Sequence, residues 1–93
     1  MFGRILKLMR EKIRKRQYVM TLHAEEEMSD DGLTIYDVES SILTGEVLER
    51  QKDKISSEWK YRIRGEIFNG NKVEVIAKLS PTGKLVIITV YRP

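Results

Sequence analysis

The chain has no cysteine and only one histidine among its 93 residues. The lack of cysteine excludes disulfide bonds, thiolate nucleophiles, iron–sulfur clusters and every zinc site that needs a Cys ligand. A single imidazole is too few for a histidine-rich metal site. We therefore expect no metal and no other cofactor, and the missing cysteines fit a reducing compartment.

Long hydrophobic runs are also missing. The longest is Leu85-Val86-Ile87-Ile88, far short of the roughly 20 apolar residues that cross a bilayer. The N-terminus is basic, but it has neither the continuous apolar stretch nor the cleavage site of a signal peptide. These absences predict a soluble cytoplasmic protein that makes no contact with membrane.

Common catalytic motifs are absent as well. The sequence contains no glycine-rich phosphate loop of the G-x-x-x-x-G-K-[ST] type, no G-x-G-x-x-G, no H-E-x-x-H and no G-x-S-x-G. Nucleotide hydrolysis, dinucleotide redox chemistry and zinc peptidase activity are therefore not expected.

Charge is distributed in three blocks. Residues 1–17 carry a net charge of +6, residues 18–49 carry −9 with no Lys or Arg, and residues 50–93 carry +6. Such blocks indicate basic surfaces that can meet phosphate. The same pattern is equally compatible with a fold in which the acidic block neutralises its basic neighbours.

The first 17 residues predict a basic amphipathic helix, because apolar residues recur at helical spacing and basic residues fill the other side. The apolar stripe consists of Phe2, Ile5, Leu6, Met9 and Ile13. This helix either packs its stripe on a core or serves as an arm that binds RNA or a partner. We treat residues 1–17 as this helix and residues 18–93 as a single α+β domain.

Two short acidic helices are predicted next, after an apolar link at residues 18–20. Thr21 is a suitable N-cap for the first, which ends at Asp30-Asp31-Gly32. The second begins at Thr34, with Asp37 in the acidic third position, and Gly45 ends it.

From residue 46 the hydrophobic period changes from 3.6 to 2, which indicates strands. The sequence predicts an α+β fold with two to three N-terminal helices packed on a four-stranded antiparallel sheet. Turns are predicted at Asn69-Gly70 and at residues 80–83. The predicted strands are residues 47–50, 59–67, 72–79 and 84–91.

The remaining polar residues suit metal-free cleavage of RNA. RNA carries its own nucleophile, the 2′-hydroxyl, so the protein needs a base, an acid and cations that stabilise the phosphorane-like transition state. His23 or a nearby Glu could be the base, Arg62, Arg64 or Arg92 the phosphate clamp, and Tyr91 a proton donor or a stacking surface. Candidates for RNA binding are Arg64, Lys60, Lys78 and Arg92.

Each candidate also has a structural interpretation. His23 could be a surface or capping residue, and Arg62 with Arg64 could form salt bridges to the acidic helices. Simple alternation puts Tyr91 on the strand face of Leu85 and Ile87, where it would pack in the core. The sequence leaves both interpretations open.

A combination of motifs over residues 18–93 resembles a family of small prokaryotic domains known as domain of unknown function 4258. The resemblance rests on a helix with an H-A-x-x-x-M pattern, on an L-T-x-x-D-V segment, on I-L-x-G-E-V, and on a terminal I-I-T-V-Y-R-P. In this chain those segments are His23–Met28, Leu33–Val38, Ile42–Val47 and Ile87–Pro93.

The resemblance implies a toxin fold similar to that of RelE, ParE and MqsR, and ribosome-independent mRNA cleavage without metal. His23 would be the family's helix histidine and Tyr91 its terminal-strand tyrosine. The partners implied are RNA and a cognate antitoxin, a YgiT-type zinc-finger protein. This chain departs from the family pattern at Glu27 and Asp31, where basic residues are common, and at Glu74, where histidine is common.

We therefore expect the toxin of a type II toxin–antitoxin pair, an endoribonuclease that acts through His23, Tyr91 and Arg62. The alternatives are a non-catalytic module that binds RNA or ribosomes through the same cations, and a protein-interaction domain that uses residues 1–17. Oligomeric state cannot be read from this sequence.

Overall fold

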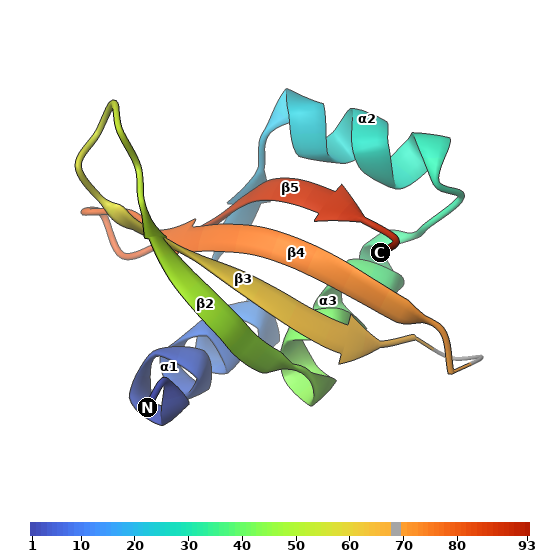
Figure 1. The fold of residues 1–93 in the computed structure, drawn as a ribbon, viewed down its shortest axis with the longest axis horizontal. Coiled ribbons are helices and arrows are strands. Elements are labelled where there is room, and N and C mark those ends of the chain that lie inside the picture. Colours follow the sequence, from blue (N-terminus) through green and yellow to red (C-terminus); the bar gives the residue numbers. More distant parts are fainter. Residues whose placement is uncertain (68–69) are drawn as a thin grey trace.

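The computed structural model describes residues 1–67 and 70–93. These residues form three helices and five strands (Figure 1). In chain order they are α1 (Gly3–Arg14), β1 (Tyr18–Met20), α2 (Leu22–Asp30), α3 (Ile35–Thr44), β2 (Glu46–Lys52), β3 (Trp59–Glu66), β4 (Lys72–Leu79) and β5 (Leu85–Tyr91).

The starts of α2 and α3 are those that the sequence predicts, whereas α1 covers Gly3–Arg14 of the predicted residues 1–17. The Thr21 side chain accepts a hydrogen bond from the backbone N–H of Ala24 at 3.1 Å, which caps α2. Thr34 and Asp37 form a reciprocal capping box at the start of α3. Gly32 follows α2 with φ +66°, a conformation that glycine adopts without strain.

The five strands form one mixed sheet in the order β1-β5-β4-β3-β2. The four predicted strands are present and pair antiparallel. The prediction of a four-stranded antiparallel sheet is wrong, because residues 18–20 form a fifth strand that pairs parallel to β5. Three residues are too few to show the alternation of a strand, so these residues are predicted as a link between helices. The predicted turn at Asn69-Gly70 lies partly outside the described residues.

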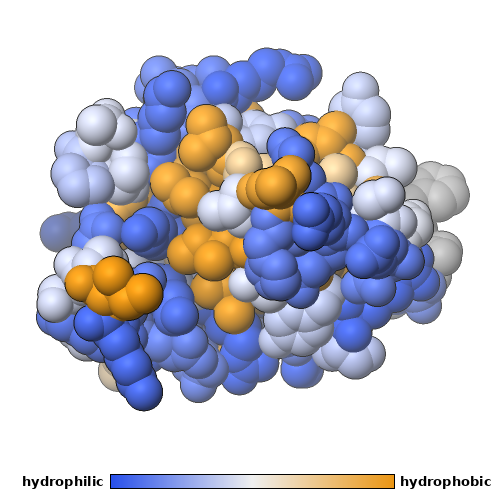
Figure 2. All heavy atoms as spheres, turned by 90° about the horizontal axis from the view of Figure 1, so that it is seen from above, coloured by the Kyte–Doolittle hydropathy of each residue, from blue (hydrophilic) through white to orange (hydrophobic). Residues whose placement is uncertain are grey.

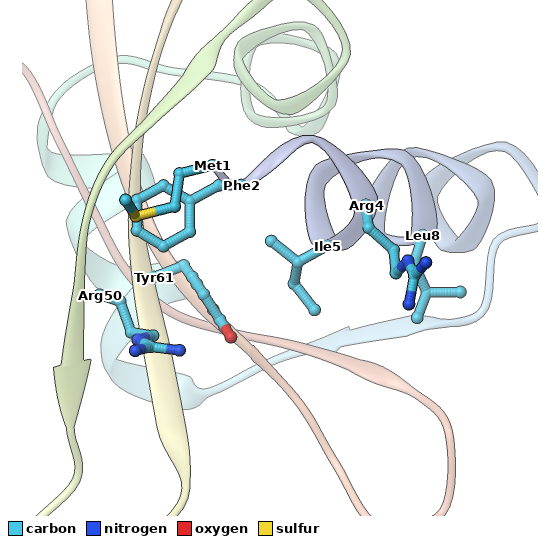
Figure 3. Close-up of a pocket in the computed structure, with 7 residues that line it drawn as sticks. All are labelled: Met1, Phe2, Arg4, Ile5, Leu8, Arg50 and Tyr61. Carbon is cyan, nitrogen blue, oxygen red and sulfur yellow. The ribbon is translucent and has the colours of Figure 1, made fainter.

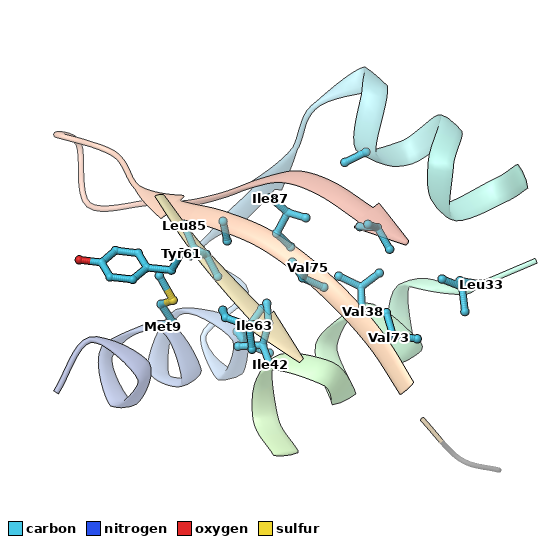
Figure 4. Close-up of a cluster of buried hydrophobic side chains, with 14 of the residues drawn as sticks. Met9, Leu33, Val38, Ile42, Tyr61, Ile63, Val73, Val75, Leu85 and Ile87 are labelled. Carbon is cyan, nitrogen blue, oxygen red and sulfur yellow. The ribbon is translucent and has the colours of Figure 1, made fainter. Parts of the chain in front are cut away.

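Helices α1 and α3 lie on the same face of the sheet and enclose the hydrophobic core with it (Figures 1 and 4). Met9 and Ile13 of α1 are both buried in this core. The Arg10 side chain holds α1 against the end of α3, because its guanidinium donates to the carbonyls of Ile42 at 3.1 Å and Gly45 at 2.7 Å. Helix α1 therefore shares one core with the sheet.

Helix α3 crosses β3 at very close range. A Cβ atom added at Gly65 would lie 2.1 Å from the backbone oxygen of Ser41. Only a residue without a side chain fits at this crossing.

Helix α2 runs beside the outer edge of β5, beyond the end of β1 (Figure 1). It provides hydrogen-bond partners to that edge. The Thr21 hydroxyl donates to the carbonyl of Ile88, and Glu27 Oε1 accepts a hydrogen bond from the backbone N–H of Val90 at 3.2 Å. Asp31 similarly accepts the N–H of Arg92 at 3.3 Å. These contacts leave fewer unpaired backbone groups on the strand edge.

Within the described residues, no helix packs on the sheet face opposite α1 and α3. We call it the open face; it carries Arg62, Arg64, Glu74 and Tyr91.

Seen from the side of α2 and β5, the surface is mostly hydrophilic, with apolar side chains gathered near its middle (Figure 2). Among the residues described, no helix is both long and apolar enough to cross a bilayer.

Candidate functional site

A β-bulge in β5 places Tyr91 on the open face. Ala77 of β4 pairs with Ile87, whereas Ile76 pairs with Thr89, so Ile88 is an extra residue in β5. The insertion reverses the alternation that simple counting gives. The expectation that Tyr91 shares the core face of Leu85 and Ile87 is therefore wrong.

The carboxylate of Glu74 is the centre of the open face. Its Oε1 accepts from Tyr91 Oη at 2.5 Å and from Arg62 Nη1 at 2.9 Å. Its Oε2 accepts from Arg64 Nε at 2.8 Å and lies 2.6 Å from Arg64 Nη2. Three residues that the sequence predicts as site residues thus converge on one acid, which the sequence reasoning did not select.

Glu74 is ionised although it is only 1% exposed. Burial raises its pKa, but the hydrogen bonds from Tyr91, Arg62 and Arg64 outweigh burial and lower the pKa to about 2. The same contact acts in the opposite direction on the phenol: burial and the bond to Glu74 raise the pKa of Tyr91. At neutral pH the pair is a carboxylate and a protonated phenol.

Arg62 bridges two acids. Its Nε donates to Glu49 Oε1 at 3.0 Å, while its Nη1 donates to Glu74. Gln51 donates to the same Glu49 oxygen at 2.7 Å, which fixes that carboxylate. The hydrogen bonds to Glu74 and Glu49 raise the pKa of Arg62 above its ordinary value. Arg62 is therefore held in one orientation across the middle of the face.

Both arginines keep N–H donors that no acid of the described residues uses. A guanidinium has five N–H groups, and the contacts of Arg62 and Arg64 to acids use two on each. The Arg62 side chain is 27% exposed and that of Arg64 is 43% exposed. The remaining donors can bond the oxygens of an anion from solvent while Glu74 stays in place.

The other predicted RNA-binding cations are distributed around this centre. Lys60 and Lys78 lie on the same face by strand alternation, and Lys78 pairs with Glu58 at 3.0 Å. Arg92 is exposed and lines a hollow of about 280 Å³ with Asn71, Lys72 and Pro93.

His23 lies apart from the cluster around Glu74. Its side chain is 67% exposed, and its Nε2 is 3.1 Å from Glu27 Oε1, one turn further along α2. The other contact of that oxygen is with the N–H of Val90, the residue before Tyr91. In the described part of the chain, no hydrogen bond or ion pair joins His23 to Arg62, Arg64 or Tyr91.

Glu27, Asp31 and Glu74, the three acids that the resemblance singled out, all make specific contacts. Glu27 and Asp31 bond the edge of β5, and Glu74 holds the open face together. The sequence does contain a signal for Glu74, because it is an acid on the outward side of a strand next to the Arg62 strand. Its burial depends on the strand register and was not predictable. Among the described residues, no three His, Cys, Asp or Glu side chains gather so as to hold a metal ion.

No curated protein and no solved structure matches the chain. A family model does match residues 20–92, which include β1 in part, α2, α3 and all strands of the open face. The family is described as "Domain of unknown function (DUF4258)". Helix α1 lies outside the matched residues.

Proposed function

The chain belongs to the DUF4258 family of domains, and we propose that it is an endoribonuclease that cleaves single-stranded RNA through the 2′-hydroxyl without metal. The observation that carries the proposal is the convergence of Arg62, Arg64 and Tyr91 on Glu74. A carboxylate, two guanidinium groups and a phenol are the groups that this reaction uses.

The scissile phosphate binds to Arg62 and Arg64. Their remaining N–H donors face solvent, and planar guanidinium groups bond phosphate oxygens in pairs. The positive charge of both arginines then stabilises the extra negative charge that develops on phosphorus. Lys60, Lys78 and Arg92 hold the neighbouring phosphates of the strand.

The 2′-hydroxyl gives its proton to the Tyr91 hydroxyl, which passes its own proton to the buried Glu74 carboxylate that it is bonded to, as the 2′-oxygen attacks phosphorus. A bound phosphate competes for the arginine charge, which raises the pKa of Glu74 from about 2 towards its ordinary value and makes it a stronger base. The bond from phosphorus to the 5′-oxygen breaks, and that oxygen takes a proton from Tyr91 or His23. The products are a 2′,3′-cyclic phosphate and a 5′-hydroxyl end.

The biological role that we propose rests on the resemblance of the sequence motifs to those of toxin-like domains. A nuclease that has no additional domain to select its substrate would cleave the mRNA of its own cell. We therefore propose a toxin with a RelE- or MqsR-like fold, kept inactive by an antitoxin. By the same resemblance, the antitoxin is a YgiT-type zinc-finger protein that covers the open face.

The test is incubation of single-stranded RNA with the purified full chain in EDTA, followed by analysis of the new ends. We expect cyclic phosphate ends from the wild type and a rate about a hundredfold lower for Glu74→Gln and for Tyr91→Phe. Glu11→Gln changes an exposed acid on α1 and serves as the matched control, with unchanged rate. His23→Ala shows which residue protonates the leaving oxygen.

Equal cleavage by wild type and Glu74→Gln would overturn this assignment of the base. Equal cleavage by all five proteins would point to a contaminating nuclease.

A second candidate is an RNA- or ribosome-binding module that does not cleave. The exposure of His23 and its pairing with Glu27, away from the open face, favour this candidate. It predicts salt-sensitive RNA binding that is lost in the double variant Arg62→Ala/Arg64→Ala, with no cleavage by any protein. The EDTA assay separates the two candidates directly.

A further inference from the structure

A second surface, on the helix-covered side of the sheet, has the features of a docking groove. It is a cavity of about 300 Å³ between the first turns of α1 and the strands β2 and β3 (Figure 3). Phe2, Ile5, Leu8 and Tyr61 supply apolar walls, and Arg4 and Arg50 flank them. The proposed RNA site lies on the opposite face of the sheet.

The groove is built on fixed elements. The rings of Phe2 and Tyr61 meet edge to face, with centroids 6.1 Å apart. Burial of Met9 and the two hydrogen bonds of Arg10 hold α1 against the core. A partner that binds here therefore meets a surface that is already ordered, which lowers the entropy cost of binding.

The rim is positively charged. The Arg50 guanidinium lies 4.1 Å from the centre of the Trp59 ring, and Lys52 Nζ lies 4.8 Å from it. Arg4, Lys7 and Arg50 are exposed. None of them takes part in an ion pair within the described residues. The groove therefore lacks negative partners for its cations.

We infer that this groove docks an acidic amphipathic segment of a partner protein. Apolar side chains of the segment fill the space between Ile5, Leu8 and Tyr61, and its carboxylates pair with Arg4 and Arg50. A protein partner fits better than RNA, because the Phe2 ring packs against Tyr61 and Tyr61 is 9% exposed, so Tyr61 presents almost no ring face for base stacking.

This inference stands independently of the proposed nuclease. The groove depends on α1, which lies outside the residues matched by the family model. A partner bound to α1 can recruit or anchor the domain while the open face stays accessible.

The test uses a synthetic helical peptide with leucines along one face and glutamates along the other. Its matched control has lysine in place of every glutamate. Calorimetric titration of the full chain is expected to show binding of the glutamate peptide and about tenfold weaker binding of the lysine peptide. Leu8→Asp and Arg4→Ala should each weaken binding of the glutamate peptide by about tenfold. Arg14 is an exposed cation outside the groove, so Arg14→Ala should leave the affinity unchanged.

Leu8 and Arg4 are at the surface, so both variants should fold, which circular dichroism checks. Equal affinity for both peptides, or equal loss in Arg14→Ala, would overturn the inference. So would a dimer of the wild-type chain that Leu8→Asp dissociates, because the groove would then be an interface between copies. RNA cleavage measured on Leu8→Asp reports separately on the open face.

Discussion

The properties of Glu74 depend on its three neighbours. A buried carboxylate by itself would be neutral, because burial disfavours its charged form. Donors from Tyr91, Arg62 and Arg64 reverse that preference and keep it ionised. The same contacts orient both arginines towards the open face, so one residue organises both the charge and the geometry of the site.

Glu74→Gln should make the protein less sensitive to acid. The folded pKa of about 2 lies below the ordinary value of 4.5. The resulting stabilisation is therefore complete above pH 4.5 and is lost as pH falls towards 2. This difference between the folded and the ordinary pKa of Glu74 contributes about 3 kcal/mol to the free energy of unfolding. Urea unfolding at pH 5 and at pH 2.5 should show a smaller loss of stability in the variant than in the wild type.

Glu11→Gln is the control for that experiment, because Glu11 is an exposed acid that forms no ion pair with the described residues. Its acid sensitivity should match that of the wild type closely. If Glu74→Gln loses as much stability between pH 5 and pH 2.5 as the wild type does, the Glu74 carboxylate is not ionised in the folded protein.

Sequence reasoning reached part of this cluster. Alternation in β3 correctly places Arg62 and Arg64 on one face, because the strand has no bulge against β4. Tyr91 was assigned to the wrong face, because one extra residue in β5 reverses every side chain after it. Glu74 was missed because its partners come from β3 and β5, and strand register is not visible in one chain's composition.

At the scale of elements, the sequence signals that depend only on neighbouring residues gave the most accurate predictions of helices and strands. Threonine caps and an acidic third residue mark where α2 and α3 begin, since a cap depends on neighbours in sequence. Strand β1 escaped prediction because its pairing with β5 is long-range and only three residues long. The close crossing of α3 and β3 at Gly65 is likewise a tertiary feature.

Gly65→Ala should destabilise the fold by about 3 kcal/mol, the upper end of the usual overpacking cost. The new methyl group would lie 2.1 Å from the Ser41 oxygen and 2.5 Å from its Cα, and backbone atoms cannot rotate away. The helix would have to move off the strand. The free energy of unfolding in urea measures the effect.

Gly3→Ala is the matched control, since nothing lies within 4 Å of a Cβ atom added there. Alanine also favours helix, so this variant should be neutral or slightly more stable. Similar losses in the two variants would show that the α3–β3 crossing is not the cause.

At the scale of the whole molecule, the ion pairs of the described residues lie mostly within one charge block. Glu58, Glu66 and Glu74 meet Lys78, Lys72 and the arginines of β3 inside residues 50–93. Neutralisation of a basic block by the acidic block is limited, among these ion pairs, to the contact of Glu49 with Arg62. The cations of the α1 groove form no ion pair with the described residues.

The two surfaces lie on opposite sides of one sheet and serve different proposed ligands. The open face has guanidinium donors around a carboxylate and suits phosphate. The groove beside α1 has apolar walls and a cationic rim and suits an acidic protein segment. A domain with this arrangement can bind RNA and a partner at the same time.

The most direct test of the central claim is an NMR titration of the full chain with a single-stranded oligonucleotide that lacks 2′-hydroxyls and so resists cleavage. The arginine side-chain Nε–H resonances are followed. We predict saturable, salt-sensitive shifts of the Arg62 and Arg64 resonances, with those of Arg4 and Arg50 unchanged. Shifts confined to Arg4 and Arg50, or no shifts at all, would contradict the claim that the open face binds RNA.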